Sequence, residues 1–310
     1  MQYSGHRPVM LEEVIDALNI ISTGIYVDLT FGRGGHAAAI LQRLGPQGRL
    51  LAIDKDPQAV AWARARFADD PRFSIAHGSF VLLPALLQQS GIASQVNGIL
   101  MDLGVSSPQL DDPQRGFSFQ QDGPLDMRMN SAAGVSVAEW LAQADGDEIA
   151  RVLFEYGEER HSRRIARAIV EARQLAPVLT TFQLADIISR AQPGRDPHKH
   201  PATRSFQALR IFINNELGDL EQCLAQIPAL LAAGGRLVVI SFHSLEDRIV
   251  KRFIRDLSRD PQLPRRLPIR QAPSQTVLCA VSRGVRASAQ EVAINPRARS
   301  AMLRVAEKVH

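Results

Sequence analysis

The sequence predicts an α/β protein in which a doubly wound parallel sheet is interrupted by a mainly helical insertion. Over the first hundred residues, short apolar runs alternate with helical stretches, the pattern of a parallel sheet flanked by helices. The alternation stops near residue 112 and resumes near residue 207. The chain has 310 residues and is 45% hydrophobic, which is enough for two domains or for one domain with a large insertion.

The first part of the chain contains four expected strands. They are the short apolar runs at 25–29, 49–53, 73–76 and 98–103. The helices expected between them cover 37–44, 58–67 and 82–89. The second of these helices has the clearest start, because Asp56 can cap it and Pro57 suits its first position.

The insertion is expected at 113–206. A segment rich in Ser, Pro, Asp, Gln and Gly at 105–128 leads into it and is interpreted as a loop. Residues 137–190 follow with helical spacing of apolar side chains, as in Ile149, Val152 and Leu153. The insertion therefore separates the two parts of one discontinuous domain, 1–112 and 207–310.

The α/β pattern then resumes. A long helix is expected at 206–231, ended by Gly234-Gly235, and a fifth strand at 236–241. A further helix begins near Leu245. Two late strands at 276–281 and 301–306 complete the sheet as a hairpin at its edge.

Composition excludes several classes of protein. Two cysteines cannot form a disulfide scaffold or a cysteine-ligated metal cluster, and they suit a reducing cytosol. No signal peptide is visible, and no apolar stretch approaches the ~20 residues that span a bilayer. We therefore expect a cytoplasmic protein without a membrane partner.

The net charge of +4 is unevenly distributed. Residues 1–112 hold 8 Lys and Arg against 11 Asp and Glu, a net charge of −3, and residues 113–206 hold 12 against 12. Residues 207–310 hold 16 against 9, a net charge of +7. A basic C-terminal block is typical of a protein with a polyanionic partner, although a solvated basic surface is an equally simple interpretation.

A glycine-rich turn follows the first strand, with glycines at 32, 34 and 35. Glycines there allow a tight turn and a close approach of the backbone to a ligand. Their spacing does not match Gly-x-Gly-x-x-Gly, which disfavours a dinucleotide site.

Acidic side chains end the neighbouring strands. Asp54 ends the second strand, where an acid can accept hydrogen bonds from ribose hydroxyls, and Asp102 ends the fourth. Phe80 follows the third strand, where its ring can flank an adenine. These acceptors fit S-adenosylmethionine, which has no phosphate, better than a nicotinamide dinucleotide.

Several motifs together resemble one family. They are Asp28-Leu29-Thr30-Phe31-Gly32-Arg33-Gly34-Gly35-His36, Met101-Asp102-Leu103-Gly104-Val105-Ser106-Ser107-Pro108-Gln109, Arg115-Gly116-Phe117-Ser118-Phe119, Gly123-Pro124-Leu125-Asp126-Met127-Arg128-Met129, Tyr156-Gly157-Glu158-Glu159-Arg160, Thr203-Arg204-Ser205-Phe206-Gln207 and Ser241-Phe242-His243-Ser244-Leu245-Glu246-Asp247-Arg248. In this order they resemble the bacterial ribosomal RNA small subunit methyltransferase H family, over nearly the whole chain.

The resemblance implies a Rossmann-like class I methyltransferase fold that uses S-adenosylmethionine to methylate the N4 amine of a cytidine in the decoding centre of 16S rRNA. It implies that the insertion recognises the substrate. It also implies seven cofactor-binding positions, all matched here: Gly34, Gly35, His36, Asp54, Phe80, Asp102 and Gln109. The Asp-Pro-Pro-Tyr signature of other amino methyltransferases is absent, because Leu-Gly-Val-Ser follows Asp102.

Two roles are open for Asp102. Its carboxylate can accept hydrogen bonds from the cytosine N4 amine during transfer, or it can hold the ammonium group of the cofactor. No metal is expected, because this chemistry needs none and no carboxylate or cysteine stands at ligand spacing around His198 and His200.

Substrate contacts have separate candidates. Phe117 and Phe119 can stack on an unstacked base or can anchor their loop to the core. Arg163 and Arg164 in the insertion, and Arg252 and Arg255 in the basic block, are candidates for contact with phosphates.

Three rival functions remain open at this point. They are a dinucleotide-dependent oxidoreductase, a small-molecule methyltransferase, and an RNA-binding ribosome-assembly factor with a methyltransferase fold. The family suggests 16S rRNA within the assembled 30S subunit as substrate, and a homodimer is compatible with the sequence.

Overall fold

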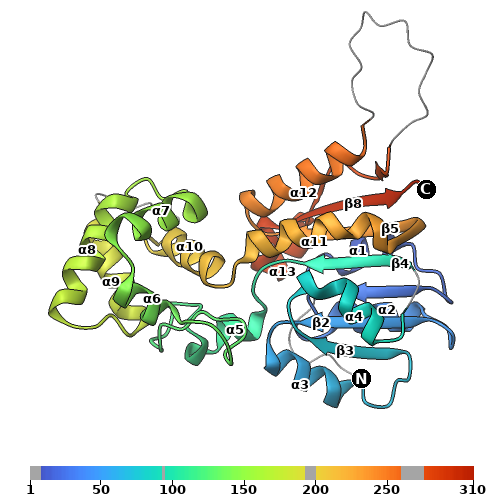
Figure 1. The fold of residues 1–310 in the computed structure, drawn as a ribbon, viewed down its shortest axis with the longest axis horizontal. Coiled ribbons are helices and arrows are strands. Elements are labelled where there is room, and N and C mark those ends of the chain that lie inside the picture. The colour runs from blue at the N-terminus through green and yellow to red at the C-terminus, as the bar shows by residue number, and fades with distance from the viewer. Residues whose placement is uncertain (1–7, 93–94, 193–199, 260–275) are drawn as a thin grey trace, which may run out of the picture. The chain divides into compact units, whose positions relative to one another are not determined.

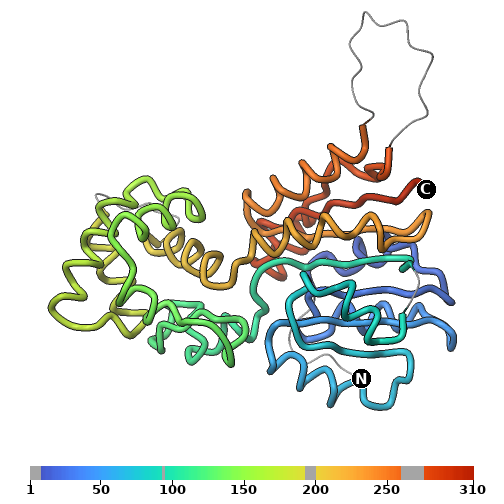
Figure 2. Tube along the Cα trace, in the orientation of Figure 1, coloured from blue at the N-terminus to red at the C-terminus, as the bar shows by residue number. Residues whose placement is uncertain are grey.

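The computed structural model describes residues 8–92, 95–192, 200–259 and 276–310. The chain divides into two compact units, which Figure 1 shows in ribbon form. The sheet unit comprises Met1–Gly104 and Gly218–His310, and the inserted unit comprises Val105–Leu217. Figure 2 traces how the chain leaves the sheet unit after its fourth strand and returns later.

The sheet unit contains an eight-stranded sheet in the order β3-β2-β1-β4-β5-β8-β6, with β7 also paired to β8. The strands are β1 (Ile25–Asp28), β2 (Arg49–Asp54), β3 (Phe73–His77), β4 (Val96–Asp102), β5 (Leu231–Ser241), β6 (Leu278–Ala280), β7 (Val285–Arg286) and β8 (Met302–Lys308). The first five pair in parallel and β8 pairs antiparallel to β5. The expected α/β fold is confirmed.

Helices cover both faces of the sheet because its strands are apolar on both sides. In β1, Val27 packs in a core with α4 (Leu83–Gln89), α11 (Glu216–Leu230) and α12 (Ser244–Leu257). The neighbouring Tyr26 packs in a second core with α1 (Leu11–Leu18), α2 (Gly35–Arg43) and α3 (Pro57–Arg66). The short elements η1 (Phe80–Leu82), α13 (Ala289–Ile294) and η3 (Pro296–Ser300) complete the unit.

The expected start of α3 is confirmed in detail. The Asp56 side chain accepts a hydrogen bond of 2.9 Å from the backbone N–H of Gln58, and Pro57 stands at the first helical position. Helix α1 was not predicted, although the buried Val14, Ile15 and Leu18 have helical spacing.

The inserted unit is mainly helical and has its own apolar core. Its elements are α5 (Ser107–Asp111), η2 (Pro113–Arg115), α6 (Val137–Gln143), α7 (Gly146–Gly157), α8 (Ser162–Leu175), α9 (Thr181–Ala191) and α10 (Thr203–Ile213). The structural limits of this unit, 105 and 217, lie outside the expected 113 and 206. The segment expected as a loop at 105–128 contains α5, which begins with a capping box between Ser106 and Gln109.

The single long helix expected at 206–231 is wrong. The chain forms α10 and α11, separated at Asn214 and Asn215. Asn215 has a left-handed backbone with φ of 49°, which interrupts the helix. The Asn214 side chain binds the backbone of Met127 and Met129, with N···O distances of 2.7 Å to each.

Within the described part of the chain, none of the helices has the length and apolar character needed to cross a membrane.

Candidate active site

Three carboxylates mark the carboxyl ends of adjacent strands in the sheet unit. Asp28, Asp54 and Asp102 end β1, β2 and β4, and the order β2-β1-β4 makes these strands neighbours. All three strands are parallel, and the order in which successive strands are added to the sheet switches sides between β1 and β4. Open α/β sheets bind ligands at such a switch point. The sheet therefore brings together Asp54 and Asp102, which were predicted from their separate positions in the sequence, and places Asp28 between them.

The Asp54 carboxylate is held by the backbone. One oxygen accepts a hydrogen bond of 2.8 Å from the N–H of Gly32, and the other accepts one of 2.8 Å from the N–H of Asp56. Burial raises the pKa of Asp54 to about 6, and these two hydrogen bonds oppose that rise. Each oxygen keeps a lone pair, so the group remains able to accept bonds from a diol.

Asp102 and His36 form a pair with unused polar atoms. His36 Nε2 lies 3.6 Å from Asp102 Oδ2, and the His36 side chain is only 7% exposed. Within the described residues, Asp102 Oδ1 and both ring nitrogens of His36 are buried and have no hydrogen-bond partner. Buried polar atoms without partners are costly, which indicates that this corner is built to contact a polar ligand.

Asp28 is 1% exposed and interacts electrostatically with both His36 and Asp102. Its carboxylate accepts a hydrogen bond of 3.1 Å from the N–H of Thr30, whose hydroxyl oxygen accepts one of 2.6 Å from the N–H of Asp102. Burial raises the pKa of Asp28 to about 7, and the nearby His36 opposes that rise. Asp28 thus holds the turn after β1, and the Thr30 hydroxyl of that turn binds the end of β4.

The glycine turn is required by packing within the protein. Gly34 has a left-handed φ of 73°, and a Cβ there would stand 2.5 Å from the Phe31 ring. A Cβ on Gly35 would collide with Pro8. The glycines therefore allow the turn to fold tightly in front of α2, which leaves its backbone close to the acids.

Phe80 begins η1, directly after the Ser79 that caps this turn. Its ring packs against the core on one side of the sheet, and the Lys55 ammonium lies 5.9 Å from the ring centroid. Lys55 forms an ion pair with Asp219, with 2.5 Å between Lys55 Nζ and Asp219 Oδ2, and neither residue was predicted. Nothing in the local sequence pattern links two residues so distant in the chain.

Gln109 belongs to the inserted unit, unlike the other six predicted cofactor residues. It is 6% exposed, and its side-chain oxygen accepts a hydrogen bond of 2.9 Å from the N–H of Ser106. This bond is half of the capping box of α5. A local structural role for Gln109 is therefore present, and its cofactor contact stays a prediction.

The two phenylalanines proposed for base stacking differ in environment. Phe117 is 6% exposed and packs in the core of the inserted unit, with the Arg115 guanidinium 5.8 Å from its ring. Phe119 is less buried, and its ring lies 4.6 Å from that of His200 and 4.8 Å from that of Phe206. The geometry favours an anchoring role for Phe117 and leaves Phe119 as the candidate for a base contact.

The arginines proposed for phosphate contact are exposed on helices. Arg163 and Arg164 lie in the first turn of α8, which contains no acidic residue. In the nearby turn, Glu159 is buried and accepts a hydrogen bond of 3.0 Å from Gln192, so its carboxylate is turned inward. Cations at a helix N-terminus oppose the helix dipole, and an anionic partner would relieve that cost.

The exposed face of α12 is a second basic surface. Arg248, Lys251, Arg252 and Arg255 are exposed, and their three- and four-residue spacing places them along one stripe. Arg255 pairs with the neighbouring Asp256 at 2.7 Å. The further arginines 265, 266 and 270 of the basic block lie outside the described residues.

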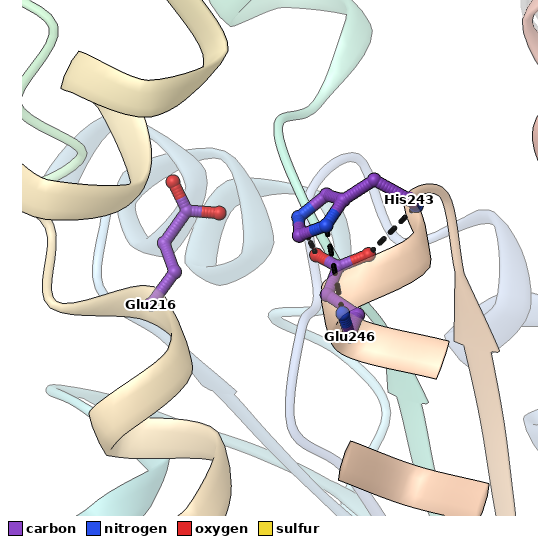
Figure 3. A group of neighbouring side chains, drawn as sticks. All are labelled: Glu216, His243 and Glu246. Atoms are coloured by element: carbon purple, nitrogen blue, oxygen red, sulfur yellow. Dashed lines mark hydrogen bonds and ion pairs between the residues drawn. The ribbon is translucent and has the colours of Figure 1, made fainter. Parts of the chain in front are cut away.

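The start of α12 has a local explanation. His243 and Glu246 form a capping box, in which the Glu246 carboxylate accepts a bond of 3.2 Å from the N–H of His243 (Figure 3). The same carboxylate accepts a bond of 2.8 Å from the N–H of Phe242. Glu246 therefore has a structural role at the start of this helix. His198, considered above for a metal, lies outside the described residues.

Comparisons with known proteins agree over almost the full chain. A model of the MraW methylase family matches residues 3–309. A relative from Thioalkalivibrio sulfidiphilus named "Ribosomal RNA small subunit methyltransferase H" is 59% identical over 305 residues, covering 98% of this chain and 97% of the relative. One of the same name from Coxiella burnetii is 55% identical over 304 residues, covering 98% and 99%.

Proposed function

The chain belongs to the MraW methylase family, and on that premise we propose that it methylates the N4 amine of a cytidine in the decoding centre of 16S rRNA. Its relatives' shared name and their 55% and 59% identity support the broader statement: the chain is an S-adenosylmethionine-dependent methyltransferase of small-subunit rRNA. The choice of amine and nucleotide rests on the resemblance of the motifs quoted above.

The residues of the sheet unit fit the cofactor. Asp54 keeps free lone pairs for the ribose hydroxyls, and Phe80 offers a ring for the adenine. Among the described residues, His36 and Asp102 have buried polar atoms without a hydrogen-bond partner, which can contact the amino-acid part of the cofactor. The turn carrying Gly34 and Gly35 allows the backbone to pass close to the methionine portion.

One observation carries the proposed chemistry: Asp102 Oδ1 is buried and has no partner within the described residues. A carboxylate oxygen in such a position favours a donor that brings positive charge. Both roles proposed for Asp102 supply one, since the N4 amine gains positive charge during transfer and the ammonium of the cofactor is cationic.

The protein's task is alignment and electrostatic stabilisation. The bound cofactor supplies a methyl group activated by its sulfonium. The cytosine amine is a poor nucleophile because its lone pair is delocalised into the ring. An acceptor at Asp102 favours the nitrogen geometry in which that lone pair can attack, and the product nitrogen then loses its proton readily, so no strong base is required first.

RNA binding is assigned to the two basic surfaces and to the loop that holds Phe119. Arg252 and Arg255 on α12, and Arg163 and Arg164 on α8, contact phosphates, which position the RNA without reading its sequence. The target base must be unstacked before the amine can reach the cofactor. The substrate is 16S rRNA within the 30S subunit, in the cytoplasm, and the enzyme can act as a homodimer.

The experiment is transfer of a tritiated methyl group from S-adenosylmethionine to 30S subunits, and separately to free 16S rRNA, from cells that lack this protein. Digestion to nucleosides should release labelled N4-methylcytidine. Label in another nucleoside would overturn the assigned amine. Tight RNA binding without any methyl transfer would instead support an assembly factor with a methyltransferase fold.

A further inference from the structure

The buried Asp219 of α11 contacts both loops that carry the predicted adenosine contacts, through an ion pair with the partly buried Lys55 and a hydrogen bond with Ser79. Asp219 is 8% exposed. Lys55 directly follows Asp54, and Ser79 directly precedes Phe80. We propose that Asp219 is a positioning residue for the adenosine half of the cofactor, acting through these two neighbours; this inference rests on the cofactor site proposed above.

The first arm of this contact runs through Ser79. Its hydroxyl donates a hydrogen bond of 2.7 Å to Asp219 Oδ2 and accepts one of 3.3 Å from the N–H of Val81. With its proton committed to Asp219, the hydroxyl presents a lone pair to cap η1, which begins at Phe80. Gln226, also on α11, donates a bond of 3.2 Å to the carbonyl of Val81 and holds the same turn.

The second arm runs through Lys55. Its ammonium lies 2.5 Å from Asp219 Oδ2 and 5.9 Å from the centre of the Phe80 ring. Its backbone carbonyl lies 3.0 Å from a ring nitrogen of His77, and the Asp54 carbonyl accepts a bond of 2.9 Å from the N–H of Gly78. The ends of β2 and β3 are therefore tied together, with Lys55 joining them to α11.

This arrangement does more than stabilise the fold. A buried carboxylate is expensive to desolvate, and a well-packed apolar side chain would often serve stability as well. The contacts of Asp219 converge on the two residues adjacent to Asp54 and Phe80. Fixing both loops before binding avoids the entropy cost of ordering them around the ligand.

The test is Asp219→Asn, which keeps the shape of the side chain and removes its charge. Calorimetry should measure the Kd for S-adenosylhomocysteine and for 5′-methylthioadenosine, which lacks the amino-acid part. We expect both Kd values to rise by the same factor, about tenfold, with kcat at saturating cofactor within about twofold of the wild type. The matched control is Glu221→Gln, an exposed acid on the same helix, which should match the wild type.

Ser79→Ala provides a second variant. It removes the hydrogen bond between Ser79 and Asp219, and the Asp219 carboxylate stays paired with Lys55. This variant should raise both Kd values by about threefold. Wild-type Kd values in both variants, or a change for S-adenosylhomocysteine alone, would overturn the inference while leaving the proposed function intact. Failure of the wild-type protein to bind S-adenosylhomocysteine would overturn the proposed function and this inference together.

Discussion

At the scale of single residues, Asp102 has the clearest functional geometry. Its Oδ1 atom is buried and has no hydrogen-bond partner in the part of the chain that the structure describes, and its Oδ2 atom lies 3.6 Å from His36 Nε2. Asp102→Asn keeps one acceptor and loses the charge, so we expect kcat/KM for methyl transfer to fall by about 100-fold. Single-turnover kinetics and the Kd for S-adenosylhomocysteine should be measured together.

The role of Asp102 follows from whether the loss appears in the Kd for the cofactor or in the rate of methyl transfer at saturation. A higher Kd with an unchanged rate at saturation assigns Asp102 to the cofactor ammonium, whereas a slower rate with an unchanged Kd assigns it to the N4 amine. A variant with wild-type turnover and affinity would contradict both roles.

Asp28 makes stability depend on pH. Its usual pKa is 3.8, and burial raises the pKa in the folded protein to about 7. The folded state therefore binds the proton more tightly than the unfolded state. The resulting stabilisation is fully present below pH ~4 and is lost as pH rises through ~7, a change of up to about 4 kcal/mol for this group.

Asp28→Asn removes this titration and keeps an acceptor for the N–H of Thr30. We expect the free energy of unfolding of the wild type to fall more steeply than that of the variant between pH 4 and 8. Urea titrations across that range measure the difference. Parallel pH profiles for the two proteins would contradict a raised pKa at Asp28.

At the scale of elements, the exposed stripe of α12 is the sharpest test of RNA contact. Lys251 and Arg252 are exposed on this stripe. Each phosphate contact releases counterions, so Lys251→Gln and Arg252→Gln should each reduce the slope of log K against log salt by about 1. Binding of 16S rRNA across a salt titration measures this slope.

A control for charge alone is Arg64→Gln, which removes an exposed arginine from α3. It should leave the salt slope within error of the wild type. If all three variants changed the slope equally, α12 would be no more than part of a diffuse basic surface.

The elements that could be predicted from sequence are those with a local physical signal. The strands of the parallel sheet were identifiable as apolar runs, and α3 was identifiable from Asp56 and Pro57. The break between α10 and α11 was missed because Asn215 adopts a left-handed backbone and Asn214 binds a distant loop. A helix end set by tertiary contacts leaves little trace in hydrophobic periodicity.

The candidate site shows the same limit. Asp54 and Asp102 were predictable because each ends a buried strand, and parallel strands bring such ends together. Asp219 was not, since it reaches Lys55 and Ser79 only through folding of segments far apart in the chain. The sequence also did not show whether the glycines are needed for ligand binding or for internal packing. A Cβ at Gly34 or Gly35 would collide with neighbouring side chains, so packing requires both glycines.

At the scale of the whole molecule, the two units have separate cores, and this separation should appear in thermal unfolding. Six of the seven predicted cofactor residues belong to the sheet unit, and only Gln109 belongs to the inserted unit. We expect two calorimetric transitions, because each unit can unfold around its own core. A ligand that binds one folded unit should stabilise that unit alone.

S-adenosylhomocysteine at 100 times its Kd should stabilise the sheet unit by about 2.7 kcal/mol and raise the temperature of one transition. The other transition should stay within error if Gln109 only caps α5. A shift of both transitions in the wild type but of one in Gln109→Ala would place Gln109 in the cofactor site. A single transition that shifts as a whole would mean that the two units unfold cooperatively, contrary to what their separate cores lead us to expect.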